Sequence, residues 1–218
     1  MNYKSKSLQI SCDGGAATGK STAAKMISMK YKLKFLSSGL LYRYASFLIL
    51  KYKPSNKIRF LKLKFKNLDY KKLDKINLQS LKISEHSAVI AKISSIRNIL
   101  KKFQTTFAKK YNMCCIEGRD ISTKILPQSD IKFFFICNLD TASLRRYREL
   151  KKTNSNIKLK DVKKALRIRN ILDTKRKNSP LLRHRDSVSI DTGKLNKQAV
   201  LKKMSKYVEK VIRLKHGN

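Results

Sequence analysis

Short apolar runs alternate with longer amphipathic stretches along most of the chain. The short runs, which predict buried strands, are residues 8–12, 113–116, 131–137 and 188–190. The longer stretches carry apolar residues at helical spacing and predict helices over residues 20–32, 40–52, 140–151 and 197–214. Asp140 is expected to cap the third of these helices. Strands that alternate with helices predict an α/β fold, a parallel sheet between layers of helices.

Two stretches depart from this alternation. Residues 53–82 mix many basic residues with scattered apolar ones, and we interpret them as a small insert that bears strands. Residues 151–160 are polar and lack an apolar stripe, which indicates an exposed, mobile loop. Plain linkers are the alternative interpretation of both stretches.

The chain has 218 residues, of which 41% are hydrophobic, enough for one compact domain with a buried core. No apolar run approaches the roughly 18 residues of a membrane span, and the N-terminus lacks the apolar segment of a signal peptide. The four cysteines are expected to be buried, reduced thiols, because none has a zinc-ligand spacing; they are Cys12, Cys114, Cys115 and Cys137. These features exclude a membrane protein and predict a cytoplasmic location.

The net charge is the unusual feature of the composition: 52 Lys and Arg against 14 Asp and Glu give +38. Such a surplus can bind the phosphates of a nucleic acid. The basic residues are spread over the whole chain, however, and tryptophan is absent. The three phenylalanines at 133–135 belong to a predicted buried strand rather than to a surface that stacks on bases. We therefore expect weak adhesion to polyanions and no specific nucleic-acid partner.

A phosphate-loop pattern, G-x-x-x-x-G-K-[ST], follows the first predicted strand and opens the first predicted helix. Small residues let successive backbone N–H groups approach phosphate oxygens, and the start of the helix adds a favourable dipole. We expect Lys20 to contact the β- and γ-phosphates of ATP and Ser21 to bind Mg²⁺. Asp13, before the loop, is either structural or a partner of the water around Mg²⁺. The expected ATP site comprises Gly14, Gly15, Ala16, Ala17, Thr18, Gly19, Lys20, Ser21 and Thr22.

The phosphate loop does not by itself identify the phosphoryl acceptor. The chain has no Asn-Lys-x-Asp motif of the kind that recognises guanine in GTPases, and it is short for a motor or helicase core. A short chain with a basic insert and a basic loop favours a small, phosphate-bearing acceptor. The alternatives are another small-molecule phosphate-loop kinase, acting on UMP, AMP or a similar compound, and an ATPase stimulated by nucleic acid.

Four further motifs resemble those of the bacterial cytidylate kinases, in the same order and at similar spacing. They are Ser38-Gly39-Leu40-Leu41-Tyr42-Arg43, Glu117-Gly118-Arg119-Asp120-Ile121, Asp173-Thr174-Lys175-Arg176 with Arg169 before it and Ser179-Pro180-Leu181 after it, and Ile190-Asp191-Thr192-Gly193. The resemblance extends from about residue 7 to residue 214. It implies transfer of the γ-phosphoryl group of ATP to CMP, and also to dCMP, which gives CDP or dCDP and ADP.

The resemblance also implies the fold of a phosphate-loop nucleoside monophosphate kinase, with a five-stranded parallel sheet in a single domain over residues 1–218. The expected core comprises residues 5–52, 85–147 and 163–214, with a monophosphate-binding insert at about 53–84 and a lid at about 148–162. The implied partner is the small-molecule substrate, without a membrane or a specific nucleic acid, and the chain is expected to be a monomer.

Carried over by position, the resemblance implies two sets of site residues. The CMP site comprises Ser38, Gly39, Tyr42, Arg43, Arg97, Glu117, Gly118, Arg119, Asp120, Arg169, Asp173 and Arg176, with Arg97 on the CMP phosphate. The catalytic side chains, whose charges stabilise the migrating phosphoryl group, are Lys20, Arg145, Arg146 and Arg176. No general base is expected, because the CMP phosphate is already mostly dianionic near neutral pH.

Three positions depart from the family's pattern. Glu117 stands where the family usually has Asp, and Asn170 where Asp is frequent after the leading arginine. A serine expected to contact cytosine falls on Ala88, with Ser87 beside it. One residue along a helix rotates a side chain by about 100°, so the contacts to the base are the part that the sequence defines least.

Overall fold

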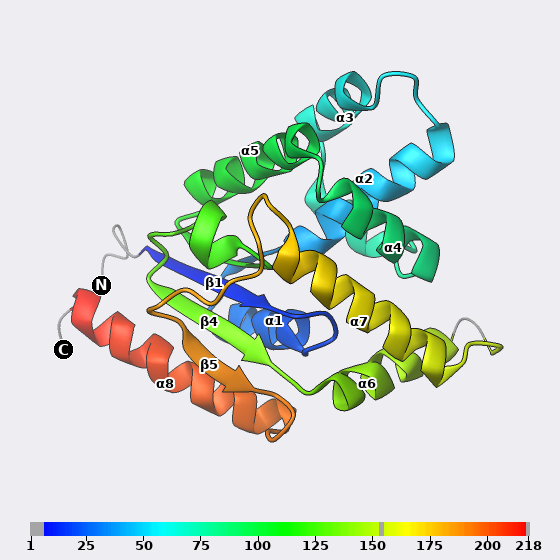
Figure 1. Ribbon diagram of the computed structural model, residues 1–218. Helices are drawn as coiled ribbons and strands as arrows, with labels where there is room; N and C mark the ends of the chain where they lie inside the picture. Colours follow the sequence, from blue (N-terminus) through cyan, green and yellow to red (C-terminus); the bar gives the residue numbers. More distant parts are fainter. Residues whose placement is uncertain (1–6, 153–154, 217–218) are drawn as a thin grey trace.

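A computed structural model describes residues 7–152 and 155–216 of the chain. Five parallel strands form one sheet in the order β2-β3-β1-β4-β5. Figure 1 shows β1, β4 and β5 side by side. Their bounds are β1 Leu8–Gly14, β2 Lys34–Ser37, β3 Met113–Gly118, β4 Ile131–Ile136 and β5 Val188–Asp191. The predicted α/β fold with a five-stranded parallel sheet is confirmed, although the sequence pattern did not indicate β2.

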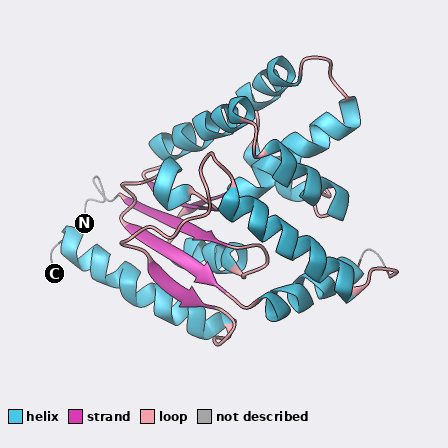
Figure 2. Cartoon of the chain, viewed as in Figure 1, coloured by secondary structure: helices cyan, strands magenta, loops and turns pink. Residues whose placement is uncertain are grey.

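Helices cover both faces of the sheet (Figure 2). On one face α1 (Lys20–Lys30) and α8 (Lys197–His216) pack on β1, β4 and β5. On the other face lie α2 (Ser38–Tyr52), α5 (Ser94–Lys110) and the short π-helical segment η2 (Ile121–Ile125). The adjacent Cys114 and Cys115 point to opposite faces, because Cys114 packs with α2 and Cys115 with α1. Of the four free thiols, Cys137 is only half-buried, whereas the other three are buried as expected.

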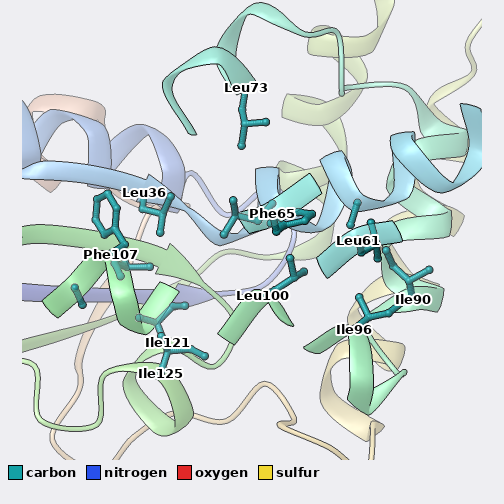
Figure 3. Close-up of a cluster of buried hydrophobic side chains, with 14 of the residues drawn as sticks. Leu36, Leu61, Phe65, Leu73, Ile90, Ile96, Leu100, Phe107, Ile121 and Ile125 are labelled. Carbon is teal, nitrogen blue, oxygen red and sulfur yellow. The ribbon is translucent and has the colours of Figure 1, made fainter. Parts of the chain in front are cut away.

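The predicted insert, residues 53–84, is helical and contains no strand within the described chain. It comprises α3 (Lys57–Lys66), the 3-10 helix η1 (Tyr70–Lys75) and the start of α4 (Leu81–Ile90). The expectation of strands is wrong because Ile58, Leu61 and Phe65 repeat at helical spacing, so one face of α3 is apolar. Figure 3 shows Leu61 and Phe65 packed beside Leu100 of α5, so the insert shares the core of the molecule.

Helices α6 (Leu139–Lys151) and α7 (Leu159–Lys175) flank the predicted lid. Asn138, not Asp140, caps α6, because its side-chain oxygen accepts a hydrogen bond from the Thr141 backbone N–H at 2.7 Å. Asp140 instead pairs with Lys163 of α7. The connection between the helices spans residues 152–158, shorter than the predicted loop because α7 already begins at residue 159, and residues 153–154 lie outside the described chain.

None of the helices in the described part of the chain combines the length and the apolar character needed to cross a membrane.

Candidate active site

The phosphate loop joins β1 to α1, as its sequence predicts. Gly14 has φ +155°, and a Cβ atom there would lie 2.5 Å from the backbone oxygen of Phe135, so a side chain is excluded. Gly19, at the N-cap of α1, has the left-handed φ of +78°. Its position makes no side-chain capping hydrogen bond, so backbone N–H groups at the start of α1 are left for a ligand.

Three side chains hold the phosphate loop in place. Lys20 Nζ donates to the Gly15 backbone oxygen at 3.2 Å, and Asn170 Oδ1 accepts from the Ala16 backbone N–H at 3.1 Å. Thr192 Oγ1 donates to the Thr18 backbone oxygen at 2.7 Å. Asn170, a departure from the family's pattern, therefore anchors the loop, and its neutral amide makes this contact without adding a negative charge.

A cavity of about 1040 Å³ opens beside the loop, between the insert and α6 and α7. All but two of the predicted site residues line it. They are Ala16, Ala17, Thr18, Gly19, Lys20, Ser21, Thr22, Ser38, Gly39, Tyr42, Arg43, Arg97, Glu117, Gly118, Arg119, Asp120, Arg145, Arg146, Arg169, Asp173 and Arg176. The two exceptions, Gly14 and Gly15, lie at the start of the phosphate loop and do not line the cavity.

Three arginines on this cavity have buried nitrogen atoms without a hydrogen-bond partner. The atoms are Arg43 Nε, Arg169 Nε and Arg176 Nη2. Burial and repulsion from neighbouring arginines together lower the pKa of Arg43 to about 9 and that of Arg169 to about 10. The cavity thus holds unpaired donors and a surplus of buried positive charge, which a polyanionic ligand would satisfy.

Two buried carboxylates, those of Asp173 and Asp120, hold the guanidinium groups of Arg119, Arg97 and Arg176 in place. Asp173 accepts from Arg119 Nε at 2.7 Å, and Arg176 Nη1 lies 3.5 Å from it. Burial alone would raise the pKa of Asp173, but Arg119 and Arg169 outweigh it and hold that pKa below its usual value. Asp120 pairs closely with Arg97, and Arg176 Nη2 lies 3.8 Å from its other oxygen.

Glu117 at the end of β3 faces the phosphate-loop lysine. Its carboxylate lies 3.7 Å from Lys20 Nζ and accepts a short hydrogen bond from Ser37 Oγ. Burial would raise the pKa of Glu117, but Lys20 and Ser37 more than offset it, and the pKa is lowered. Burial, aided by Arg119, lowers the pKa of Lys20 to about 7. Glu117 and the more weakly acting Asp173 therefore do not fully compensate Lys20 without a ligand.

Asp13 has a structural role, one of the two that the sequence left open. Its carboxylate accepts from the backbone N–H groups of Ile121 and Ser122 at 2.8 and 2.7 Å, and from Ser122 Oγ at 2.6 Å. It is fully buried and does not line the cavity. Burial raises its pKa to about 6 in spite of these hydrogen bonds. Asp13 thus holds η2 against β1.

Thr192 and Gln79 contact arginines of the site but were not among the predicted site residues. Thr192 accepts Arg145 Nη1 on its hydroxyl at 3.1 Å and Arg145 Nη2 on its backbone oxygen at 2.7 Å. Gln79, in the insert, accepts hydrogen bonds from Arg43 and Arg146. Thr192 belongs to the last of the sequence motifs, so the sequence could have predicted it as a site residue. Gln79 lies outside every motif, and the sequence gives no such signal for it.

The loop, the parallel sheet and the cation-lined cavity define a phosphate-loop kinase. Two solved structures share the fold. The first is an uncharacterized protein from Eubacterium ventriosum, with a TM-score of 0.55 and 16% sequence identity. The superposition covers 94% of this chain and 99% of that protein. TT1252 from Thermus thermophilus has a TM-score of 0.53 at 15% identity, over 94% of this chain and 98% of its own.

The sequence comparison defines the family more narrowly. The family model for cytidylate kinase matches residues 10–210, so the chain belongs to the cytidylate kinase family. The cytidylate kinase of Rickettsia canadensis is 33% identical over 94% of both chains. That of Clostridium tetani is 30% identical over 93% of this chain and 94% of its own. The family predicted from the sequence motifs is confirmed, and it supports ATP-dependent phosphorylation of CMP.

Proposed function

We propose that this protein transfers the γ-phosphoryl group of ATP to CMP, and also to dCMP, to give CDP or dCDP and ADP. The observation that carries the proposal is the pair of buried guanidinium nitrogens without a hydrogen-bond partner, Arg43 Nε and Arg169 Nε, which share one cavity with Lys20. Two phosphate-bearing nucleotides would supply the negative charge that these groups lack.

On the donor side, the phosphate loop and Lys20 bind the phosphates of ATP. The uncapped start of α1 supports this role, because its N–H groups need acceptors. Among the described residues no group of three or more His, Cys, Asp or Glu side chains could hold a metal. We propose that the Ser21 hydroxyl, which lines the cavity, holds Mg²⁺ together with the ATP phosphates. The ion would neutralise phosphate charge there.

On the acceptor side, we propose that Arg97 and Asp120 bind the base. Arg97 offers only donors and the Asp120 carboxylate only acceptors. Side by side, they match the N3 acceptor and N4 amino donor of cytosine, whereas uracil presents a donor at N3 and an acceptor at O4. The Arg97 guanidinium lies 5.6 Å from the Tyr42 ring centroid, and Ala88 lines the same cavity, which suits a flat base.

This role for Arg97 differs from the one that the family resemblance implies, contact with the CMP phosphate. Asp120 already balances the charge of Arg97 in a buried pair. Arg43 and Arg169, in contrast, have unpaired nitrogens, and Arg169 is close enough to Lys20 to lower its pKa. We therefore propose that Arg43 and Arg169 bind the CMP phosphate, with Arg119, which Asp173 holds in place, beside them.

For the transfer itself, a phosphate oxygen of CMP attacks the γ-phosphorus, and the bond to the bridging β–γ oxygen breaks. No general base is required, since this oxygen is already ionised near neutral pH. The chain's contribution is to align two polyanions and to stabilise the transferred group, by Lys20, Arg145, Arg146 and Arg176. We propose that the insert at 53–84 and the lid at 148–162 close over the substrates and exclude water.

The remaining assignments are proposals of the same kind. We propose that the protein acts in the cytoplasm as a monomer, without a membrane or a specific nucleic-acid partner. The monomer is supported by the cavity, because all the proposed catalytic residues line it within one chain.

The proposed function predicts a clear order of substrates. Purified protein with Mg·ATP should phosphorylate CMP with a kcat/KM about tenfold or more above that for UMP, AMP or GMP, because a site built around Arg97 and Asp120 leaves polar groups unpaired with the wrong base. Release of ADP, measured in a coupled assay with each monophosphate, checks this order.

A Lys20→Ala preparation made in parallel controls for contaminating kinases. Equal rates with all four monophosphates would contradict the assignment of CMP. ATP turnover that depends on DNA or RNA, with no phosphorylated mononucleotide, would favour the nucleic-acid-stimulated ATPase instead.

ATP binding should also take up protons. With a pKa of about 7, about nine in ten Lys20 side chains are neutral at pH 8 in the substrate-free protein. Phosphates beside Lys20 favour its charged form and raise its pKa, so binding at pH 8 should take up about one proton per site. At pH 6 Lys20 is already charged and the uptake should nearly vanish. Calorimetry of Mg·ATP binding in buffers of different ionisation enthalpy measures this number, and equal uptake at both pH values would refute the expectation.

A further inference from the structure

Gln79 connects two arginines that belong to different parts of the site. It lies in the insert, between η1 and α4. Its side-chain Oε1 accepts from Arg43 Nη1 at 2.7 Å and from Arg146 Nη1 at 3.2 Å. Its backbone oxygen also accepts from Arg146 Nη2 at 2.7 Å. Since Arg43 belongs to α2 and Arg146 to α6, one residue of the insert joins the acceptor side of the cavity to the helix that enters the proposed lid.

Negative charge is scarce around this pair of arginines. Arg43 Nε is buried without a partner, and burial lowers the pKa of Arg43 to about 9, with repulsion from Arg169 and Arg146 acting in the same direction. Arg146 has one carboxylate partner, Glu149, at 3.0 Å, and that side chain is 65% exposed. Its charge is therefore partly screened by solvent.

The chemistry of residue 79 decides what this contact does. An amide oxygen accepts hydrogen bonds from both guanidinium groups and fixes their directions without cancelling their charge. A carboxylate at the same place would make stronger, charge-assisted bonds to both and would compete with a phosphate for the same donors.

We infer that Gln79 is a positioning residue, whose neutral amide holds Arg43 and Arg146 toward the cavity and leaves the charge of Arg43 for the phosphate of the acceptor nucleotide and that of Arg146 for the transferred phosphoryl group. The inference rests on the proposed function, because it needs a nucleoside monophosphate in the cavity. Gln79 should therefore affect the affinity for the phosphate and not that for the base, because Arg97 and Asp120, which we propose bind the base, belong to other elements.

The test compares Gln79→Glu with Gln79→Ala and measures the affinities for CMP and for cytidine, which lacks the phosphate. Gln79→Glu should weaken CMP binding about tenfold or more, and the KM for CMP should rise with it, because the new carboxylate occupies both arginines. Cytidine affinity should change less than about twofold. Gln79→Ala keeps the cavity charge and loses only the alignment, so its CMP affinity should fall by a smaller factor, about threefold.

Gln128→Glu is the matched control, since it makes the same charge change at an exposed residue outside the cavity and should leave both affinities unchanged. Gln79 is itself exposed, so Gln79→Ala should stay close to the wild-type melting temperature, and Gln79→Glu should melt at or above it because the new carboxylate pairs with both arginines. Wild-type CMP affinity in Gln79→Glu would overturn the inference, and so would an equal loss of CMP and cytidine. A wild-type protein that binds another monophosphate in place of CMP contradicts the proposed substrate instead, and the same comparison with that nucleotide and its nucleoside then tests Gln79.

Discussion

Replacing Lys20 with alanine should lower the rate of CMP phosphorylation about a thousandfold or more, while the fold survives. Lys20 is 7% exposed and lies within the loop that we propose binds the donor, so alanine at this position leaves the transferred phosphoryl group without this charge. Fixed charges at such a position contribute several kcal/mol to the stabilisation of a transition state, roughly 2.7–4 for a single donor. Steady-state rates with saturating Mg·ATP and CMP measure the loss.

The fold should survive because the charged form of Lys20 destabilises the folded, substrate-free protein. Its pKa of about 7 lies below that of an unfolded lysine, so the folded state disfavours the charged form. This destabilisation is present in full below pH 7, and it decreases as the pH rises from 7 toward the pKa of lysine in the unfolded chain. Lys30→Ala, in the same helix but 45% exposed and paired with Glu209, is the matched control and should keep full activity. Near-normal turnover by Lys20→Ala would mean that the loop is not the donor site.

The sequence could predict much of the site because its motifs sit where parallel strands end. The phosphate loop follows β1, Ser38 follows β2, Arg119 follows β3 and Thr192 follows β5. The carboxyl ends of parallel strands lie at one edge of the sheet, so residues far apart in sequence meet there without any knowledge of the loops between them. That is why nearly every residue taken from the motifs lines one cavity.

The insert could not be predicted in the same way. Leu61, Leu63 and Phe65 alternate with lysines, which is the period of a strand and competes with the helical spacing of the segment. Only the packing of Leu61 and Phe65 on the core decides for a helix. Gln79 stands in a segment without a motif, and its role follows from the meeting of three elements: the insert, α2 and α6. A departure from the family's pattern such as Asn170 is likewise visible in the sequence, but its contact with the phosphate loop is not.

Replacing Arg169 with methionine should lower kcat/KM for CMP about a hundredfold or more and at the same time stabilise the substrate-free protein. Arg169 Nε is buried without a hydrogen-bond partner on the wall of the cavity, and burial and Arg119 both lower the pKa of its guanidinium. A buried charge with an unpaired donor costs free energy until a ligand arrives, so its removal relieves that cost and removes a phosphate contact. The rate loss corresponds to about 2.7 kcal/mol of transition-state stabilisation.

Arg167→Met is the matched control, because Arg167 lies on the same helix, is exposed and does not line the cavity. It should leave both the rate and the melting temperature close to those of the wild-type protein. The proposal for Arg169 requires the two effects of Arg169→Met together: a large loss of rate and a melting temperature at or above the wild-type value. A variant that loses activity because it unfolds at a lower temperature would show that Arg169 stabilises the fold through its attraction to Asp173, and that its unpaired nitrogen is not a phosphate-binding group.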